Sequence, residues 1–179
     1  RPFQRTPFQW SLHHVGEDDK IMHYEFLAPG DTNPTLEFVT TLIDALAGSD
    51  RPIVVYSSFE KSTLTDISKQ FPDLADDIQA IMDRLVDLLP IVRTNTYFRD
   101  YNGSFSIKTV APAVAPHLSY KGLDHVADGL AASAAFERVA SGELLPDEDA
   151  VTLRAALLEY CKLDTLAMVE VHRALLASC

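Results

Sequence analysis

Tyr160 and Asp164 are the residues whose types and spacing most clearly suggest chemistry. They lie four positions apart, so in a helix both side chains project from the same face. Asp164 also interrupts an apolar stripe. At helical spacing that stripe consists of Leu157, Cys161, Met168, Val171 and Leu175. An ionised carboxylate in such a stripe is costly unless a cation, hydrogen-bond donors or a cleft compensates for it. The pair therefore indicates a position with a possible functional role.

Glu60 is a second acid that the pattern turns inward. It falls in the first turn of an expected helix, directly after an expected buried strand, and the residues four and seven positions later, Leu64 and Ile67, are apolar. A carboxylate near a helix N-terminus can simply stabilise the helix dipole. Alternatively, Glu60 and Asp164 could ligate a divalent metal ion, because Mg²⁺ takes oxygen ligands. The spacing alone leaves both interpretations open.

The first half of the chain has the element order of an α/β protein. Two alternating stretches, residues 7–15 and 21–28, flank a turn-rich segment and predict a β-hairpin. A helix is expected from Pro34, capped by Asn33, until Gly48. The apolar run from Ile53 to Tyr56 then predicts a strand buried on both faces, and a helix capped by Ser57 or Ser58 follows it.

The second half is expected to be mainly helical. A helix that opens at Pro72 should run into residues 86–89. Residues 94–120 carry aromatics and prolines without a long period, which indicates a loop with short helices. Helical spacing returns around residues 130–139 and in a long helix over about residues 147–177. We expect one domain over residues 1–179, because this length suits a single core.

The composition of the chain limits the partners and the cellular location that we expect for the protein. A net charge of −11 argues against a broad basic surface for nucleic acid, although a small, locally compensated contact remains open. Cys161 and Cys179 provide neither a disulfide framework nor metal-ligand spacing, so a reducing cytoplasm is expected. Neither a bilayer-spanning stretch nor a leader is expected, hence no membrane. The start at Arg1, without Met, suggests a piece of a larger protein.

Two motifs resemble those of the DnaQ-like exonucleases of the tyrosine-containing DEDD type. Tyr160-x-x-x-Asp164 is similar to their third motif, and Tyr56-Ser57-Ser58-Phe59-Glu60 resembles their second, usually Asn-x-x-Phe/Tyr-Asp. Val86-Asp87-Leu88 is similar to the segment after the second motif. Most of the chain also resembles an uncharacterised bacterial domain family of the ribonuclease-H-like group, which often follows a RecB-like nuclease domain. The segments that carry this resemblance are residues 7–13, 23–28, 103–108 and 160–165.

The resemblance implies a ribonuclease-H-like mixed sheet flanked by helices. It further implies a metal-dependent 3′–5′ exonuclease acting on the single-stranded end of DNA or RNA, with an attached N-terminal nuclease domain. Glu60 and Asp164 would hold Mg²⁺ or Mn²⁺ in a two-metal site, and Tyr160 would orient the attacking water. Substrate contacts are expected from four residues of the chain: Ser57, Phe59, Asp87 and Lys108.

The chain departs from the exonuclease pattern in three places. Glu60 replaces the usual Asp, and Ser57 replaces the usual Asn. The first motif, Asp-x-Glu on the opening strand, is absent, so this fragment is expected to lack its first strand and to be inactive or nearly so. Two alternatives follow: a nuclease fold that serves as a binding or scaffolding module, and a phosphodiesterase for small molecules.

Several other residues keep two interpretations. Asp87 can be a helix-end residue, and Lys108 can be simply solvated. The aromatics from Tyr97 to Phe105 can stack on bases of a single strand or pack down a long loop. His13 and His14 should face opposite ways on a strand, which argues against a shared metal, whereas His23 and Glu25 share a face.

Overall fold

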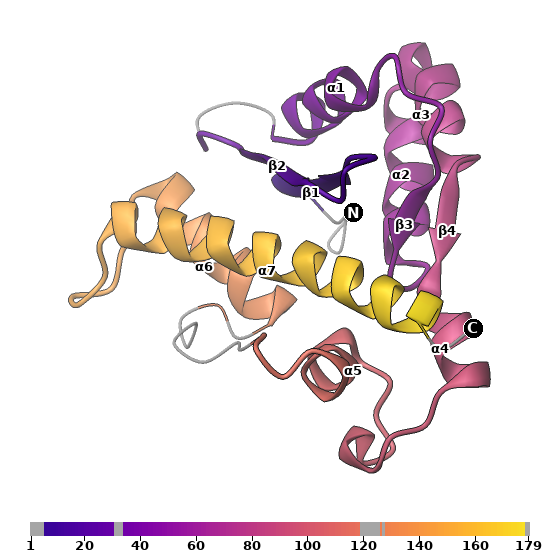
Figure 1. The fold of residues 1–179 in the computed structure, drawn as a ribbon. Coiled ribbons are helices and arrows are strands. Elements are labelled where there is room, and N and C mark those ends of the chain that lie inside the picture. The colour runs from indigo at the N-terminus through magenta and orange to yellow at the C-terminus, as the bar shows by residue number, and fades with distance from the viewer. Residues whose placement is uncertain (1–5, 31–33, 119–125, 127, 178–179) are drawn as a thin grey trace. The chain divides into compact units, whose positions relative to one another are not determined.

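The structure is a computed structural model that describes residues 6–30, 34–118, 126 and 128–177 (Figure 1). Internal contacts divide the chain into two compact units. The first, called here the hairpin unit, comprises Thr6–Phe38 and Ser119–Leu166. The second, called here the helical unit, contains Val39–Leu118 and the chain from Ala167 onward. The helices α1 (Pro34–Leu46) and α7 (Ala150–Ala177) each contribute residues to both units, and each unit has its own buried residues.

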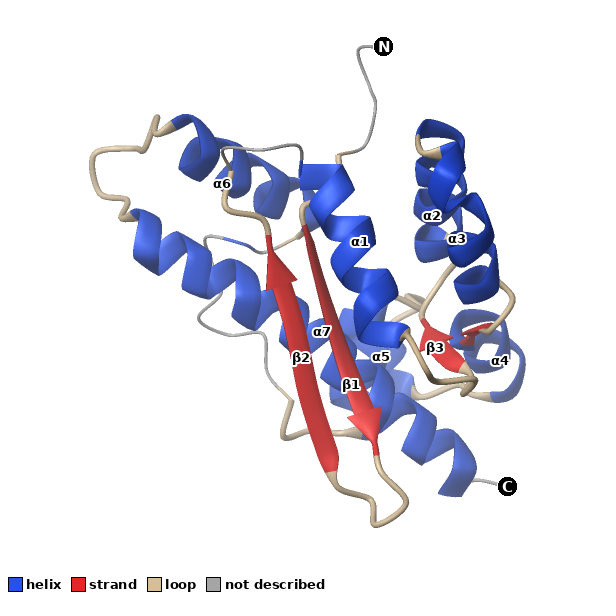
Figure 2. Cartoon of the chain, turned by 90° about the horizontal axis from the view of Figure 1, so that it is seen from above, coloured by secondary structure: helices blue, strands red, loops and turns tan. Residues whose placement is uncertain are grey.

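The hairpin unit is built on two antiparallel strands, β1 (Gln9–Val15) and β2 (Ile21–Leu27) (Figure 2). Val15 faces Ile21 at the turn, and Gln9 faces Leu27 at the other end. The turn is closed by a hydrogen bond of 2.8 Å from the Gly16 N–H to the Lys20 carbonyl. The hairpin predicted from the alternating pattern is therefore confirmed.

Two helices complete the hairpin unit, α6 (Gly129–Ser141) and the first part of α7 (Ala150–Ala177). The Asp128 carboxylate caps α6 by accepting hydrogen bonds from two backbone N–H groups, and Gly142 ends the helix with φ of 75°. Asp149 accepts from the Thr152 N–H at the start of α7. Both helices were predicted, α7 with a start three residues too early. Buried residues of the two helices form one core together with Ala28 and Val126; the helix residues are Ala132, Ala135, Phe136, Leu153, Leu157 and Tyr160.

The helical unit begins within α1 (Pro34–Leu46), which starts at the predicted proline; its predicted cap Asn33 lies outside the described residues. The strand β3 (Ile53–Val55) and the helix α2 (Phe59–Gln70) follow, as the pattern of buried strand and helix predicted. The remaining elements are η1 (Pro72–Leu74), α3 (Ala75–Met82), β4 (Leu85–Asp87), α4 (Leu88–Asn95), η2 (Arg99–Tyr101) and α5 (Ile107–Val114). Short helices in the aromatic segment were predicted and are confirmed.

The expected continuation of a helix through residues 86–89 is wrong. The helix α3 ends at Met82, and Leu85–Asp87 forms the strand β4, which pairs in parallel with β3. Pairing places Val54 beside Val86 and satisfies backbone groups that β3 would otherwise leave without partners. A run of three residues is too short for periodicity to separate a strand from a helical turn.

The architecture is mixed α/β, as predicted. The described strands form two two-stranded sheets, β1–β2 in the hairpin unit and β3–β4 in the helical unit, rather than one mixed sheet. Although α7 has the length to cross a bilayer, none of the helices in the described part of the chain is both long enough and apolar enough to do so. Among the described residues, Cys161 is in no disulfide bond, and Cys179 lies outside the described residues.

Candidate active site

Tyr160 and Asp164 lie one turn apart on α7 within the hairpin unit. Tyr160 is 9% exposed and belongs to the core, and the Oδ1 atom of Asp164 is shielded from solvent. The pKa of the Tyr160 phenol is raised above its usual range, chiefly by burial and further by the adjacent Asp164 carboxylate, to which the phenol is hydrogen bonded. The neutral phenol is therefore a hydrogen-bond donor at any physiological pH.

Glu60 lies in the first turn of α2 in the helical unit, directly after β3. Its Oε2 atom is shielded from solvent, so the carboxylate is turned inward as the spacing predicted. The same position suits stabilisation of the helix dipole, the other interpretation that the sequence left open. Glu60 and Asp164 belong to different units, and each is placed by the contacts of its own unit.

Asp87, the last residue of β4, forms a hydrogen bond with the segment that follows β3 in the helical unit. Its Oδ1 atom accepts hydrogen bonds from the Ser57 N–H at 2.8 Å and from the Leu89 N–H at 2.9 Å. The second bond makes Asp87 the N-cap residue of α4, because it satisfies a helix-end donor. The helix-end role that the sequence allowed is thus present, and it fixes the position of this carboxylate.

Ser57 and Phe59 form the tight connection between β3 and α2. Ser57 has a φ of 108°, which is strained for a residue with a side chain, and its Oγ accepts a hydrogen bond from the Phe59 N–H at 3.2 Å. The Phe59 ring is 55% exposed. Lys108 lies in the first turn of α5, in the same unit. The expected substrate residues therefore share a unit with Glu60 and not with Tyr160.

The donor chemistry suits a hard divalent cation, because the predicted ligands are carboxylate oxygens. Across the residues that the structure describes, however, no three His, Cys, Asp or Glu side chains gather closely enough to hold a metal ion. A complete metal site would need ligands additional to those grouped here.

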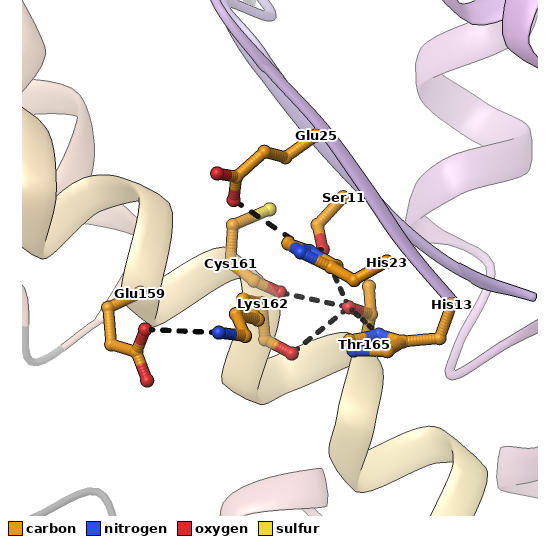
Figure 3. Close-up of polar contacts among 8 residues, drawn as sticks. All are labelled: Ser11, His13, His23, Glu25, Glu159, Cys161, Lys162 and Thr165. Atoms are coloured by element: carbon orange, nitrogen blue, oxygen red, sulfur yellow. Dashed lines mark hydrogen bonds and ion pairs between the residues drawn. The ribbon is translucent and has the colours of Figure 1, made fainter. Parts of the chain in front are cut away.

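A polar cluster joins the hairpin to α7 and was not singled out in the sequence (Figure 3). Thr165 Oγ1 lies 2.8 Å from both Ser11 Oγ and His13 Nδ1, and Ser11 Oγ lies 2.9 Å from His23 Nε2. The rings of His13 and His23 pack at 4.6 Å between centroids. His23 and Glu25 share a face, as predicted, with 3.7 Å between Nε2 and Oε2.

One proton arrangement satisfies this cluster throughout. Thr165 donates to the Lys162 carbonyl at 3.1 Å and accepts from Ser11 and His13, while Ser11 accepts from His23. Burial, then the neighbouring His23 and Lys162, lower the pKa of His13 to about 4. The His13 imidazole in this half-buried network is therefore neutral at neutral pH.

The pairing of His13 with His23 could have been predicted from the register of the hairpin. In this hairpin the numbers of facing residues add to a constant, so His13 must face His23 once the turn is placed at residues 16–20. Thr165 is 152 positions from His13, and local pattern says nothing about a contact at that separation.

The chain belongs to the family described as Domain of unknown function (DUF2779), whose sequence profile matches residues 1–106. The matched stretch contains the hairpin, Glu60 and Asp87, and it ends before α6 and α7. Membership of an uncharacterised domain family, predicted from the sequence, is thereby confirmed. Neither curated proteins nor solved structures yield a match to the chain.

Proposed function

We propose that the protein is a metal-dependent 3′–5′ exonuclease of the DnaQ-like type, with a ribonuclease-H-like fold. The observation that carries the proposal is the pair on α7: a shielded carboxylate, Asp164, bonded to a buried neutral phenol, Tyr160. This is the pair that resembles the third exonuclease motif. The hairpin followed by a helix, a strand and the helix that bears Glu60 is compatible with the same proposal.

In this proposal Asp164 and Glu60 supply carboxylate oxygens for Mg²⁺ or Mn²⁺, together with an Asp-x-Glu pair of the kind that the resembled exonucleases carry. The role of Glu60 comes from the resemblance alone. The bound metal ions would lower the pKa of water and offset charge on the leaving oxygen. Tyr160, which donates its single O–H to Asp164, would accept a hydrogen bond from the attacking water through its phenolic oxygen and so hold that water in line.

The proposal also includes an attached domain and a cellular location. A RecB-like nuclease domain on the N-terminal side and a cytoplasmic location would both suit a nucleic-acid enzyme. Cys161, which is in no disulfide bond, is compatible with reducing conditions.

Cleavage by the full-length protein tests the proposal. Single-stranded DNA and RNA labelled at the 5′ end are incubated with Mn²⁺ and wild-type protein, Asp164→Ala, Tyr160→Phe or the control Glu159→Gln. Glu159 is an exposed acid on the same helix, paired with Lys162 at 3.7 Å. We expect shortening from the 3′ end, lost in Asp164→Ala, reduced about 100-fold in Tyr160→Phe and retained in the control. Equal cleavage by wild type and Asp164→Ala would remove Asp164 from the mechanism.

A second candidate is a nuclease-fold module that binds or scaffolds an attached nuclease without cleaving. It is favoured by Glu60 and Ser57, which replace the usual Asp and Asn, and by the use of Asp87 in two local backbone hydrogen bonds. An extra methylene displaces a metal ligand beyond the tolerance of about 0.5 Å that such sites have. A folded full-length protein that neither cleaves nor takes up Mn²⁺ would support this candidate.

A further inference from the structure

Figure 1 shows the segment between α4 and α5 in the helical unit. The side chains of this segment form an aromatic cluster. Its centre is Tyr101, which is 1% exposed. The rings of Tyr97, Phe98 and Phe105 lie 6.4, 5.4 and 5.8 Å from the Tyr101 ring, centroid to centroid. The sequence left two roles open for these aromatics, packing of the loop and stacking on bases. Part of the cluster packs the loop, and part of it does not.

The outer two rings remain in solvent. Tyr97 is 72% exposed and Phe98 is 46% exposed. The other two aromatic residues, Tyr101 and Phe105, are held by hydrogen bonds. The Thr96 hydroxyl lies 3.2 Å from the Tyr101 hydroxyl, and the Tyr56 hydroxyl donates to the Phe105 carbonyl at 2.9 Å. Tyr101 and Phe105 already pack the loop, so the exposed rings of Tyr97 and Phe98 are not needed for that packing. We call Tyr97 and Phe98 the aromatic platform.

The stretch of chain that contains the aromatic platform has a net charge opposite to that of the whole chain. Residues 88–118 contain Arg93, Arg99 and Lys108 and the single acid Asp100, a net charge of +2, whereas the chain carries −11. The Arg93 guanidinium lies 6.0 Å from the centre of the Phe105 ring, so one of these cations is part of the cluster itself. A local excess of cations in an acidic protein favours an anionic ligand.

We propose that the aromatic platform binds single-stranded nucleic acid, with bases stacked on Tyr97 and Phe98 and with phosphates near Arg93 and Arg99. Sites for single strands combine exposed aromatic rings with a basic track in this way. Aromatic rings present flat faces to unpaired bases, which a duplex keeps stacked inside. This binding does not depend on hydrolysis or on a metal ion, so it stands apart from the exonuclease proposal.

Fluorescence anisotropy of the full-length protein with a labelled 20-nucleotide oligothymidine, in EDTA, tests the proposal. Wild-type protein is compared with Tyr97→Ala, Phe98→Ala and Tyr97→Phe. The matched control is Tyr24→Ala, because Tyr24 is also an exposed tyrosine, 48% exposed, on β2. Thermal melts followed by circular dichroism establish that each variant is folded.

We expect Tyr97→Ala and Phe98→Ala to weaken binding about 10-fold each, because a base-stacking ring is lost. Tyr97→Phe keeps the ring and should bind like wild type, as should Tyr24→Ala. The plot of log affinity against log salt concentration should have a slope no steeper than about −1.5, because the proposal assigns two cations, Arg93 and Arg99, to phosphates. EDTA prevents cleavage, so a loss of binding and a loss of nuclease activity are measured separately.

Three results would overturn the proposal. The first is absence of binding at 100-fold excess of folded protein over oligonucleotide in low salt. The second is equal affinity for a duplex of the same length, which would indicate contact with phosphates alone. The third is a wild-type dimer that Tyr97→Ala converts into monomers without any effect on oligonucleotide affinity, which would assign the aromatic platform to contact between copies of the chain.

Discussion

The Asp87 carboxylate accepts hydrogen bonds from two backbone N–H groups in different parts of the chain, those of Ser57 and Leu89. Asp87→Ala removes the acceptor for the Ser57 and Leu89 N–H groups. We expect a loss of about 1 to 2 kcal/mol in the free energy of unfolding, the usual cost of a missing N-cap. Urea unfolding followed by circular dichroism measures it. Asp87→Asn retains a side-chain acceptor and should recover most of the loss; an equal loss in both variants would mean that the charge matters and not the hydrogen bonds.

His13 makes the hairpin unit sensitive to acid. Its pKa is lowered to about 4 by burial and by the neighbouring His23 and Lys162, whereas an unfolded histidine titrates near 6.5. Between these values the unfolded chain binds more protons, so stability is retained above pH 6.5 and lost as the pH falls towards 4. After allowance for the partial exposure of the ring, we expect a loss of about 1 to 2 kcal/mol.

The lone tryptophan, Trp10 on β1, reports on this loss. Urea unfolding followed by its fluorescence at pH 7 and pH 4.5 should show the decrease for wild type and for His14→Gln. In His13→Gln the decrease should be smaller, because the titrating ring is gone. An unchanged decrease in His13→Gln would assign the acid sensitivity to other groups.

Residue-scale prediction from sequence succeeded where partners are close in the chain. Tyr160 and Asp164 are one helical turn apart, and the structure joins them by a hydrogen bond. The inward turn of Glu60 likewise followed from the apolar residues of its own helix. The contacts of Thr165 with Ser11 and His13 depend on how a helix packs on a hairpin, which residue types and spacing do not encode locally.

At the scale of elements, Arg154 attaches α7 to the end of β2. Its guanidinium donates to the Ala28 carbonyl at 2.9 Å and to the Leu27 carbonyl at 3.2 Å. Arg154→Met keeps most of the aliphatic stem and removes both bonds, so we expect a loss of about 1.5 to 3 kcal/mol. Urea unfolding followed by Trp10 fluorescence measures it.

A matched arginine on the same helix provides the control for this experiment. Arg173 pairs with Glu170 at 3.2 Å one turn away, and a partly exposed pair of this kind contributes about 1 kcal/mol or less. Arg173→Met should therefore change stability little. A similar loss in the two variants would show that Arg154 acts through general helix effects and not through the end of β2.

Elements with strong end signals were predictable from sequence. Gly16 and the acids after it marked the hairpin, Pro34 began α1, and Gly142 ended α6. The strand β4 was missed because it has three residues and its identity comes from pairing with β3. The division of four strands into two small sheets also depends on packing within each unit, which no local pattern records.

For the whole molecule, the net charge of −11 attracts any divalent cation weakly and diffusely. Removing one acid anywhere weakens that diffuse attraction by a similar small amount. A specific metal ligand must therefore be recognised by comparing two variants that change the net charge equally. Asp164→Asn and Glu159→Gln, on the same helix, make that comparison.

Calorimetric titration of the full-length protein with Mn²⁺ is the most direct test of the proposed function. Wild-type protein and Glu159→Gln should show the same saturable uptake, and Asp164→Asn should weaken or abolish it, because one of the carboxylate ligands is lost. Identical titrations of wild type and Asp164→Asn would contradict the assignment of Asp164 as a metal ligand and, with it, the metal-dependent mechanism.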